Sequence, residues 1–318
     1  GVQTCALPIL QAYPATDEGN KAKNIPDLIY CDVDYLNKKG ERQHPEYRPS
    51  WSPDLQMTTG YIDTGVWMNS PQTFVHLIQN SDSISSVVTE YYLNNILSFD
   101  EQVMHLPIIL LSKPSKLLKH KKTIKTKQWT TGNEPLVSLI VPTKNGLELV
   151  KTCIQSIVEK TTYKNYEILL IDNNSDDKAA IDYFNELSEQ GIVRLLKYAK
   201  PFNYSAINNF AVQHAKGSII GLINNDIEVI SPDWLTFMVG HVLREDIGCV
   251  GAKLLYPNNT IQHAGVVLGY GGGAGHAHKY FDRGDPGYMQ RLGATNNFSA
   301  VTAACLLVTK VDYNLVHG

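Results

Sequence analysis

The stretch "LVSLIVPTKNGLELVKTCIQSIVEKTTYKNYEILLID", residues 136–172, carries the pattern that decides the fold. Residues 136–142 are mostly apolar and predict a buried strand, whereas residues 147–160 repeat apolar side chains at helical spacing. Residues 166–172 then predict a second buried strand. Two buried strands joined by a helix of this length predict a right-handed crossover between parallel strands.

The same alternation continues along the chain. A helix is predicted from about residue 177, a strand over 192–198, a helix over 204–215 and a strand over 218–223. The fold class is therefore α/β: a Rossmann-type, mainly parallel sheet with helices on both faces. In such sheets, ligands bind beyond the carboxyl ends of the strands.

Polar clusters follow three of the predicted strands: "PTKN" (142–145), "DNNSDD" (172–177) and "NND" (224–226). They predict a ligand site at this edge of the sheet. The carboxylate of Asp172 could accept hydrogen bonds from a ribose or a nucleobase. The alternative for this second cluster is an Asx turn, with Ser175 or Asp176 as the helix cap.

The third cluster contains one carboxylate, Asp226, behind two asparagines. A hard oxygen ligand of this kind can hold Mg²⁺ or Mn²⁺, which would neutralise the charge on a departing diphosphate. Asn224 offers only a neutral oxygen, so we expect a weakly held metal that is shared with the nucleotide. The alternative is a polar turn before residues 231–233 begin the next helix.

The loop after the first strand contains Thr143, Lys144 and Asn145, which could bind a phosphate or a base. Asn145 with Gly146 is equally typical of a turn. A dinucleotide-binding oxidoreductase would need a G-x-G-x-x-G fingerprint here, and "PTKNGLE" does not supply it.

Residues 263–280 combine His263, His276 and His278 with a run of glycines. A zinc site is not favoured, because no third ligand stands at a recognisable spacing. We expect a glycine-hinged loop that closes over the donor and the acceptor, with these histidines near the substrate. An ordinary surface loop is the alternative.

The composition of the 318 residues is that of a globular protein, with 43% hydrophobic and 19% charged residues. The net charge of -3 argues against a nucleic-acid-binding protein. The five cysteines are far apart and form no C-x-x-C pair, which indicates reduced thiols and a cytoplasmic location. The longest apolar runs reach about half of the roughly 20 residues that a membrane-spanning helix needs.

Composition also divides the chain. Residues 1–24 are interpreted as a non-native or unassigned leader, because "GVQTCALPIL" matches no pattern that follows. Residues 113–134 are lysine-rich with little apolar periodicity, so they predict a linker between residues 25–112 and a main domain over 135–318. The linker is either a solvated connector or a patch that rests on anionic lipids at the inner face of the plasma membrane.

Five motifs occur in a fixed order: "VSLIVPTKNGLELVKTCIQSIVEKTTYKNYEILLIDNNSDD", "KPFNYSAINNFAV", "LINNDIEVISPDWL", "VGAKLLYPNNTIQHAGVVLG" and "FSAVTAACLLV". Together they resemble the family-2 glycosyltransferases of the GT-A fold, in particular the two-domain bacterial proteins of O-antigen, capsule and rhamnan assembly. The resemblance covers nearly all of residues 135–318. It implies inverting transfer of a sugar from a UDP- or dTDP-sugar donor to a saccharide or lipid-linked glycan, in cell-surface polysaccharide synthesis.

The resemblance also implies roles for residues. Pro142, Thr143 and Asp172 would lie against the nucleoside. Asn208 and Asn209 would line the donor pocket, and Asn224–Asp226 would replace the metal-binding DxD motif, with Asn in place of the first Asp. The predicted nucleotide-sugar site comprises Pro142, Thr143, Asn145, Asp172, Asn174, Asn208, Asn209, Asn224, Asn225 and Asp226, with Asp226 as the metal ligand and His263, His276 and His278 toward the acceptor.

Residues 25–112 are similar to the latter half of the first glycosyltransferase domain of such tandem proteins. We therefore expect an incomplete second GT-A-like domain, closed by a strand over 101–114. Its Asp32 and Asp34 are expected as charged residues in a strand-to-turn connection before Gly40.

The catalytic base of the family lies beyond a Gly-Gly-Phe segment, and this chain stops at Gly318, where that segment should begin. The resemblance therefore implies that the base is missing and the fragment inactive; Asp282 and Asp285 lie in a turn and are poor substitutes. Two alternatives remain: an incomplete nucleotide-sugar-binding or scaffold module, and a nucleotidyltransferase, which would need a more basic loop after the first strand.

Overall fold

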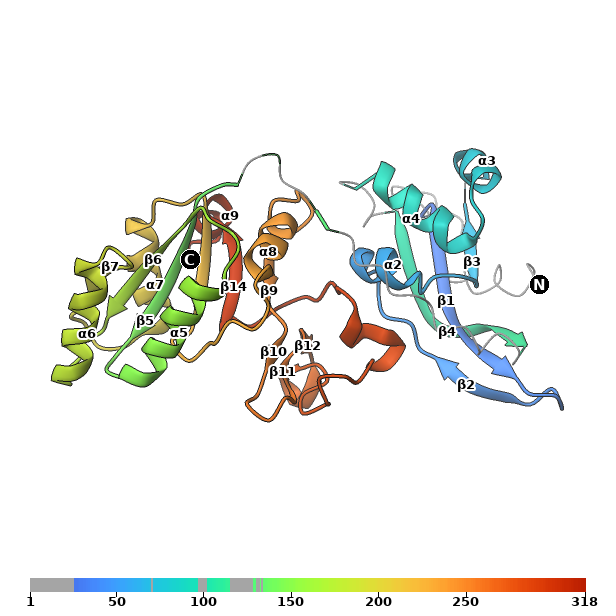
Figure 1. The fold of residues 1–318 in the computed structure, drawn as a ribbon. Coiled ribbons are helices and arrows are strands. Elements are labelled where there is room, and N and C mark those ends of the chain that lie inside the picture. Colours follow the sequence, from blue (N-terminus) through green and yellow to red (C-terminus); the bar gives the residue numbers. More distant parts are fainter. Residues whose placement is uncertain (1–25, 70, 97–101, 115–127, 130–131, 133) are drawn as a thin grey trace, which may run out of the picture. The chain divides into compact units, whose positions relative to one another are not determined.

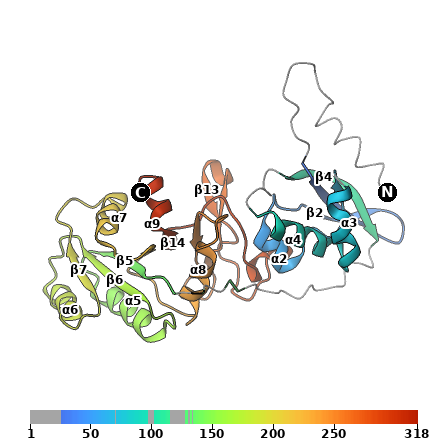
Figure 2. The same ribbon diagram turned by 90° about the horizontal axis from the view of Figure 1, so that it is seen from above.

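A computed structural model describes residues 26–69, 71–96, 102–114, 128–129, 132 and 134–318. The chain divides into two compact units, shown from two directions in Figures 1 and 2. The first comprises the described residues before Gln128 together with Gly284–Asn297; the second comprises Gln128–Arg283 and Phe298–Gly318. The predicted leader and most of the predicted linker lie outside the described residues.

A six-stranded sheet forms the centre of the second unit, in the order β7-β6-β5-β8-β14-β9. Four of its strands are parallel, and β14 is antiparallel to both β8 and β9. The predicted mainly parallel sheet is thus confirmed. The strands are β5 (Val137–Thr143), β6 (Tyr166–Asp172), β7 (Arg194–Lys197), β8 (Ile219–Ile223), β9 (Cys249–Gly251) and β14 (Cys305–Thr309).

Helices cover both faces of this sheet, as the sequence predicts (Figure 2). Alternate strand residues point to opposite faces, so Leu139 packs in one apolar cluster and Ile140 in another. The first cluster includes side chains of α5, α6 and α8, and the second those of α7. The helices are α5 (Leu147–Lys160), α6 (Lys178–Glu189), α7 (Tyr204–His214), α8 (Trp234–Val242) and α9 (Lys310–Leu315).

The cap of α6 differs from the one named in the Asx-turn alternative. Asp177, and neither Ser175 nor Asp176, caps the helix, because its side chain accepts a hydrogen bond from Ala179 N at 2.9 Å. The side chain of Ser175 instead accepts from the backbone N–H of Asn145 at 2.8 Å. Ser175 and Asp176, which precede the cap, therefore help to hold the loop between β6 and α6.

Two small hairpins follow α8 in the second unit. One pairs β10 (Leu254–Leu255) with β11 (Ile261–His263), and the other pairs β12 (Val266–Leu268) with β13 (Ala274–His276). The 3₁₀ turn η3 (Tyr270–Gly272) lies between β12 and β13. The glycine-rich segment predicted as a loop thus contains an antiparallel hairpin, because backbone pairing to Val266–Leu268 supplies order that the glycines alone do not indicate.

The first unit is built around one long strand, β1. Strands β2 and β3 pair with it in the antiparallel sense, and β4, the strand predicted over 101–114, pairs with it in parallel. Helices α2, α3 and α4 bury their apolar sides against it. The elements are β1 (Leu28–Leu36), β2 (Arg42–Glu46), α2 (Pro53–Thr59), β3 (Val66–Met68), α3 (Pro71–Asn80), α4 (Ile84–Asn94), β4 (Val103–Pro114) and η4 (Tyr288–Gly293).

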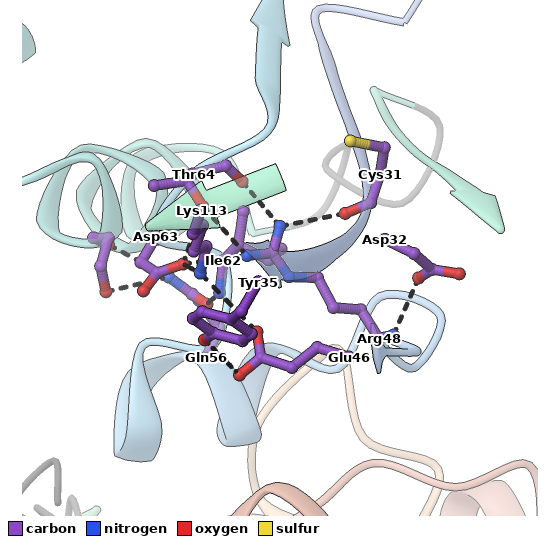
Figure 3. A network of polar contacts seen from close by, with 11 residues as sticks. Cys31, Asp32, Tyr35, Glu46, Arg48, Gln56, Ile62, Asp63, Thr64 and Lys113 are labelled. Carbon is purple, nitrogen blue, oxygen red and sulfur yellow. Dashed lines mark hydrogen bonds and ion pairs between the residues drawn. The ribbon is translucent and has the colours of Figure 1, made fainter. Parts of the chain in front are cut away.

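Buried charged side chains in the first unit have polar partners (Figure 3). Asp63 accepts hydrogen bonds from Arg48 and from Lys113, each at 2.9 Å. Asp32 accepts from the backbone of Arg48 and contacts His105 Nε2, both at 2.8 Å. Asp32 and its neighbour Asp34 lie inside β1 rather than in the predicted strand-to-turn connection, because the pairing of β1 with β4 extends the strand to Leu36.

None of the helices in the described part of the chain has the length and apolar character needed to cross a membrane.

Candidate functional site

The polar clusters after β5, β6 and β8 lie together at one edge of the sheet. Thr143 and Asp172 are register partners at the ends of β5 and β6. Asn225, just after β8, donates from Nδ2 to Thr143 Oγ1 at 3.0 Å. The structure therefore brings together the three loops that the sequence predicts as a ligand site, at the edge where parallel sheets bind ligands.

Asn145 joins two of these loops. Its backbone is in the left-handed region, at a φ of 55°, which asparagine tolerates better than most residues. Its side-chain Oδ1 accepts from the N–H groups of Asp176 and Asp177 at 2.9 and 3.0 Å, and its Nδ2 donates to Asp176 at 2.7 Å. That last bond lowers the pKa of Asp176. Asn145 therefore holds the loop in place through both the oxygen and the nitrogen of its amide.

Asp172 is largely buried at the end of β6, and one of its oxygens, Oδ1, accepts from Ser175 N at 2.9 Å. Oδ2 makes no hydrogen bond among the described residues. Next to it, Asn173 donates from Nδ2 to the carbonyls of Tyr198 and Lys200 at 2.9 and 2.8 Å. Asn174 follows with a φ of 56°. The loop is thus rigidly held while one oxygen of Asp172 stays available to a ligand.

The loop after β8 is held by its backbone. Asn224 N donates to Ala304 O at 2.9 Å, and the Asn224 carbonyl accepts from the thiol of Cys153 at 3.7 Å. Burial and the nearby charge of Asp226 raise the pKa of Cys153 to about 12, so the thiol keeps its proton as a donor. Cys153 thus supports the loop and is not a nucleophile.

Asp226 itself is exposed, and within the described residues its carboxylate makes no hydrogen bond or ion pair. Three acids of the first unit differ from it. Asp32 contacts His105, Asp34 pairs with Arg42, and Asp63 pairs with Arg48 and Lys113. Asp226 can therefore take up a cation without first losing a partner in the protein.

A metal site made by the protein alone is not present in the described residues, where no three His, Cys, Asp or Glu side chains are grouped to hold an ion. One free carboxylate beside two asparagines fits an ion that takes its other ligands from a bound diphosphate and from water. The weakly held, shared metal remains a prediction of the sequence, and the surroundings of Asp226 are compatible with it.

Other predicted site residues are engaged in contacts within the protein. Asn208 is buried in α7 and donates to Tyr204 O at 2.8 Å. The Oδ1 of Asn209 accepts from the hydroxyl of Tyr313 at 2.5 Å. Pro142 is half-buried within β5. Among the described residues, no hydrogen bond joins the side chain of Asn208 or Asn209 to the strand-end loops.

The three histidines divide into a pair and a single residue. His263 and His276 approach with their Nδ1 atoms 2.8 Å apart. His278 lies elsewhere and contacts the ring of Phe281 edge-on, with centroids 5.3 Å apart. The downstream carboxylate Asp285 accepts from Gly287 N at 2.7 Å, as the predicted turn requires.

Some supporting residues were missed by the sequence analysis. Thr302 and Ala304 lie beside the loop after β8, because β14 pairs with β8 so that Cys305 faces Ile223. Cys153 reaches the same loop from α5. Nothing in the local sequence indicates these contacts, since each joins segments far apart in the chain.

Comparison with known proteins places these residues in a family. The sequence model of "Glycosyl transferase family 2" matches residues 138–300, which is just over half of the chain. An uncharacterised Sinorhizobium fredii protein, y4gI, is 45% identical over 191 residues, which make up 60% of this chain and 21% of that protein. The Myxococcus xanthus O-antigen biosynthesis protein RfbC is 28% identical over 92% of this chain and 25% of its own length.

An Escherichia coli protein named UDP-Glc:alpha-D-GlcNAc-diphosphoundecaprenol beta-1,3-glucosyltransferase, WfgD, is 29% identical over 42% of this chain and 49% of its own length. The chain spans a quarter or less of the first two relatives. The matched residues contain all three strand-end loops described above. The chain belongs to glycosyl transferase family 2.

Proposed function

We propose that the second unit binds a nucleoside-diphosphate sugar at the carboxyl ends of β5, β6 and β8, as the donor half of a glycosyltransferase that moves the sugar, with inversion, to a saccharide or lipid-linked acceptor. The observation that carries this proposal is the free, exposed carboxylate of Asp226 beside the loops of Thr143 and Asp172. The names of the relatives RfbC and WfgD support a role in polysaccharide assembly and a UDP-sugar donor.

Each loop has a separate task in this proposal. Asp172 Oδ2 would accept a hydrogen bond from the nucleoside, because Oδ1 is already used by Ser175. Asp226 would hold Mg²⁺ or Mn²⁺ together with the diphosphate. Bound there, the ion would supply positive charge to the leaving group. Asn145 and Asn225 would fix the loops in advance, so that little conformational freedom is lost on binding.

Calorimetric titration with UDP and with dTDP, each with and without Mn²⁺, tests the proposal. We expect Mn²⁺-dependent binding that is lost in Asp226→Asn, which keeps the shape of the side chain but removes its charge. Glu228→Gln is the matched control. It also removes one acidic charge nearby, and among the described residues the Glu228 carboxylate pairs with Lys160 alone, at 2.8 Å. Absence of binding to a folded wild-type chain, or equal losses in both variants, would overturn the proposal.

A further inference from the structure

The two histidines of the pair have different surroundings. His263, at the end of β11, is 1% exposed, whereas His276, at the end of β13, is exposed. Their rings are perpendicular, at 89°, with centroids 5.0 Å apart, and the shortest contact joins Nδ1 to Nδ1 at 2.8 Å. A contact of this length is a hydrogen bond, in which one nitrogen carries the hydrogen and the other accepts it.

The backbone decides which nitrogen donates. The N–H groups of Gly265 and Thr302 both point at His263 Nε2, at 3.3 and 3.4 Å. Because a backbone N–H can only donate, Nε2 must accept and carries no hydrogen. The neutral ring of His263 therefore carries its hydrogen on Nδ1 and donates it to His276. His276 in turn accepts at Nδ1, which leaves its own hydrogen on Nε2.

The surroundings keep His263 neutral. Burial, with a contribution from His276, lowers the pKa of His263 to about 4. A proton added at Nε2 would also face the two backbone N–H groups. The direction of the hydrogen bond to His276 is thus fixed at neutral pH.

The pair is connected to the strand-end site. Thr302, which donates to His263, also accepts from Ala304 N at 3.4 Å through Oγ1. Ala304 O accepts from Asn224 N at 2.9 Å, at the start of the loop that carries Asp226. A chain of hydrogen bonds therefore connects the loop after β8 with His276.

We propose that His276 is a ligand-binding residue whose Nε2–H donates to a diphosphate oxygen of the nucleotide-sugar, and that His263 is the positioning residue that fixes this tautomer. The binding role rests on the proposed function. A phosphate oxygen only accepts hydrogen bonds, so a histidine that is held as an N–H donor is suited to it. A zinc ion is a poor alternative, because the two Nδ1 atoms are joined by a hydrogen and the described residues offer no third ligand nearby.

The tautomers can be read directly by ¹⁵N NMR of the imidazole nitrogens in the whole chain, without any ligand. We expect His263 to be protonated at Nδ1 and His276 at Nε2. In His263→Ala, His276 should change to the mixture of tautomers typical of a free imidazole. A hydrogen on Nε2 of His263, or no change at His276 in a folded variant, would overturn the positioning role.

The binding role is tested with UDP and Mg²⁺, which does not broaden the spectrum. The Nε2 signal of His276 should shift on titration, and His276→Ala should weaken UDP binding roughly tenfold or more. His276→Gln, which keeps an N–H donor, should recover part of the loss, and His214→Gln on α7 should bind as the wild type does. UDP binding that is equal in the wild type and in His276→Ala would overturn the binding role alone, whereas a wild type that binds no UDP would overturn the proposed function and this role with it.

Discussion

Asn145 shows how one residue combines a backbone and a side-chain task. Its φ of 55° would strain most residues. Its side-chain amide oxygen accepts hydrogen bonds from the backbone N–H groups of Asp176 and Asp177. Asn145→Ala loses both advantages and should lower the free energy of unfolding by about 2–3 kcal/mol. Asn145→Gly loses only the amide, so it should be about 1 kcal/mol milder. Urea unfolding of the two variants compares them; a glycine variant less stable than the alanine variant would contradict this account of the backbone.

His263 should make the stability of the second unit depend on pH. Its pKa is about 4 in the folded chain, below the ordinary value of about 6.5 expected after unfolding. As the pH falls below 6.5, the unfolded chain therefore takes up a proton that the folded chain does not. The contribution of His263 to the free energy of unfolding is fully present above pH 6.5 and is lost progressively as the pH falls toward 4.

The loss at pH 5 should be about 2 kcal/mol relative to pH 7.5. Other groups titrate in this range, so the measured quantity is the difference between the wild type and His263→Gln in denaturant unfolding at the two pH values. Within the described part of the chain, His263 hydrogen-bonds to His276 and to the N–H groups of Gly265 and Thr302, and none of these supplies a negative charge that would stabilise the imidazolium. A pH slope that is the same in both proteins would show that His263 is not buried in its neutral form.

At the scale of elements, the entry into β8 depends on Gly217. A β-carbon added there would lie 2.6 Å from Leu136 O and 2.7 Å from Ser138 N, which are backbone atoms that cannot move aside. Gly217 N also donates to the buried hydroxyl of Ser138 at 2.8 Å. Gly217→Ala should therefore cost about 2–4 kcal/mol, because the added β-carbon overpacks the backbone around it. Gly248→Ala, where nothing lies within 4 Å, is the control and should be nearly neutral in thermal unfolding.

Elements with a strong local period were predictable. Helix α5 and strand β6 have the predicted bounds, because their apolar positions repeat at helical spacing or form an uninterrupted run. The antiparallel strand β14 was not predictable in the same way, since its pairing with β8 joins residues distant in sequence. The hairpin of β12 and β13 is local, but its glycine-rich sequence does not indicate strand pairing. The three strand-end clusters were found because the topology of a parallel sheet brings them together. The bond from Thr302 to His263 required the structure.

At the scale of the whole molecule, each unit buries an apolar core of its own. Leu55 lies in the core of the first unit and Leu139 in that of the second, and both are 0% exposed. Leu55→Ala and Leu139→Ala should each cost about 2–5 kcal/mol in their own unit. Differential scanning calorimetry should show two transitions, with a different one lowered by each variant. UDP with Mn²⁺ should raise only the transition that Leu139→Ala lowers; a single transition lowered by both variants would contradict separate cores.

The central claim is that the nucleotide and its metal ion bind beside Asp226, at the carboxyl ends of β5, β6 and β8. Paramagnetic broadening in ¹H–¹⁵N spectra locates the ion most directly, by comparing one equivalent of Mn²⁺ with one of Mg²⁺ in the presence of UDP. The account predicts that Mn²⁺ selectively broadens the amide signals of Asp226, Asn225 and Thr143, and that Asp226→Asn abolishes this effect. Broadening centred elsewhere in the chain, or unchanged in Asp226→Asn, would contradict it.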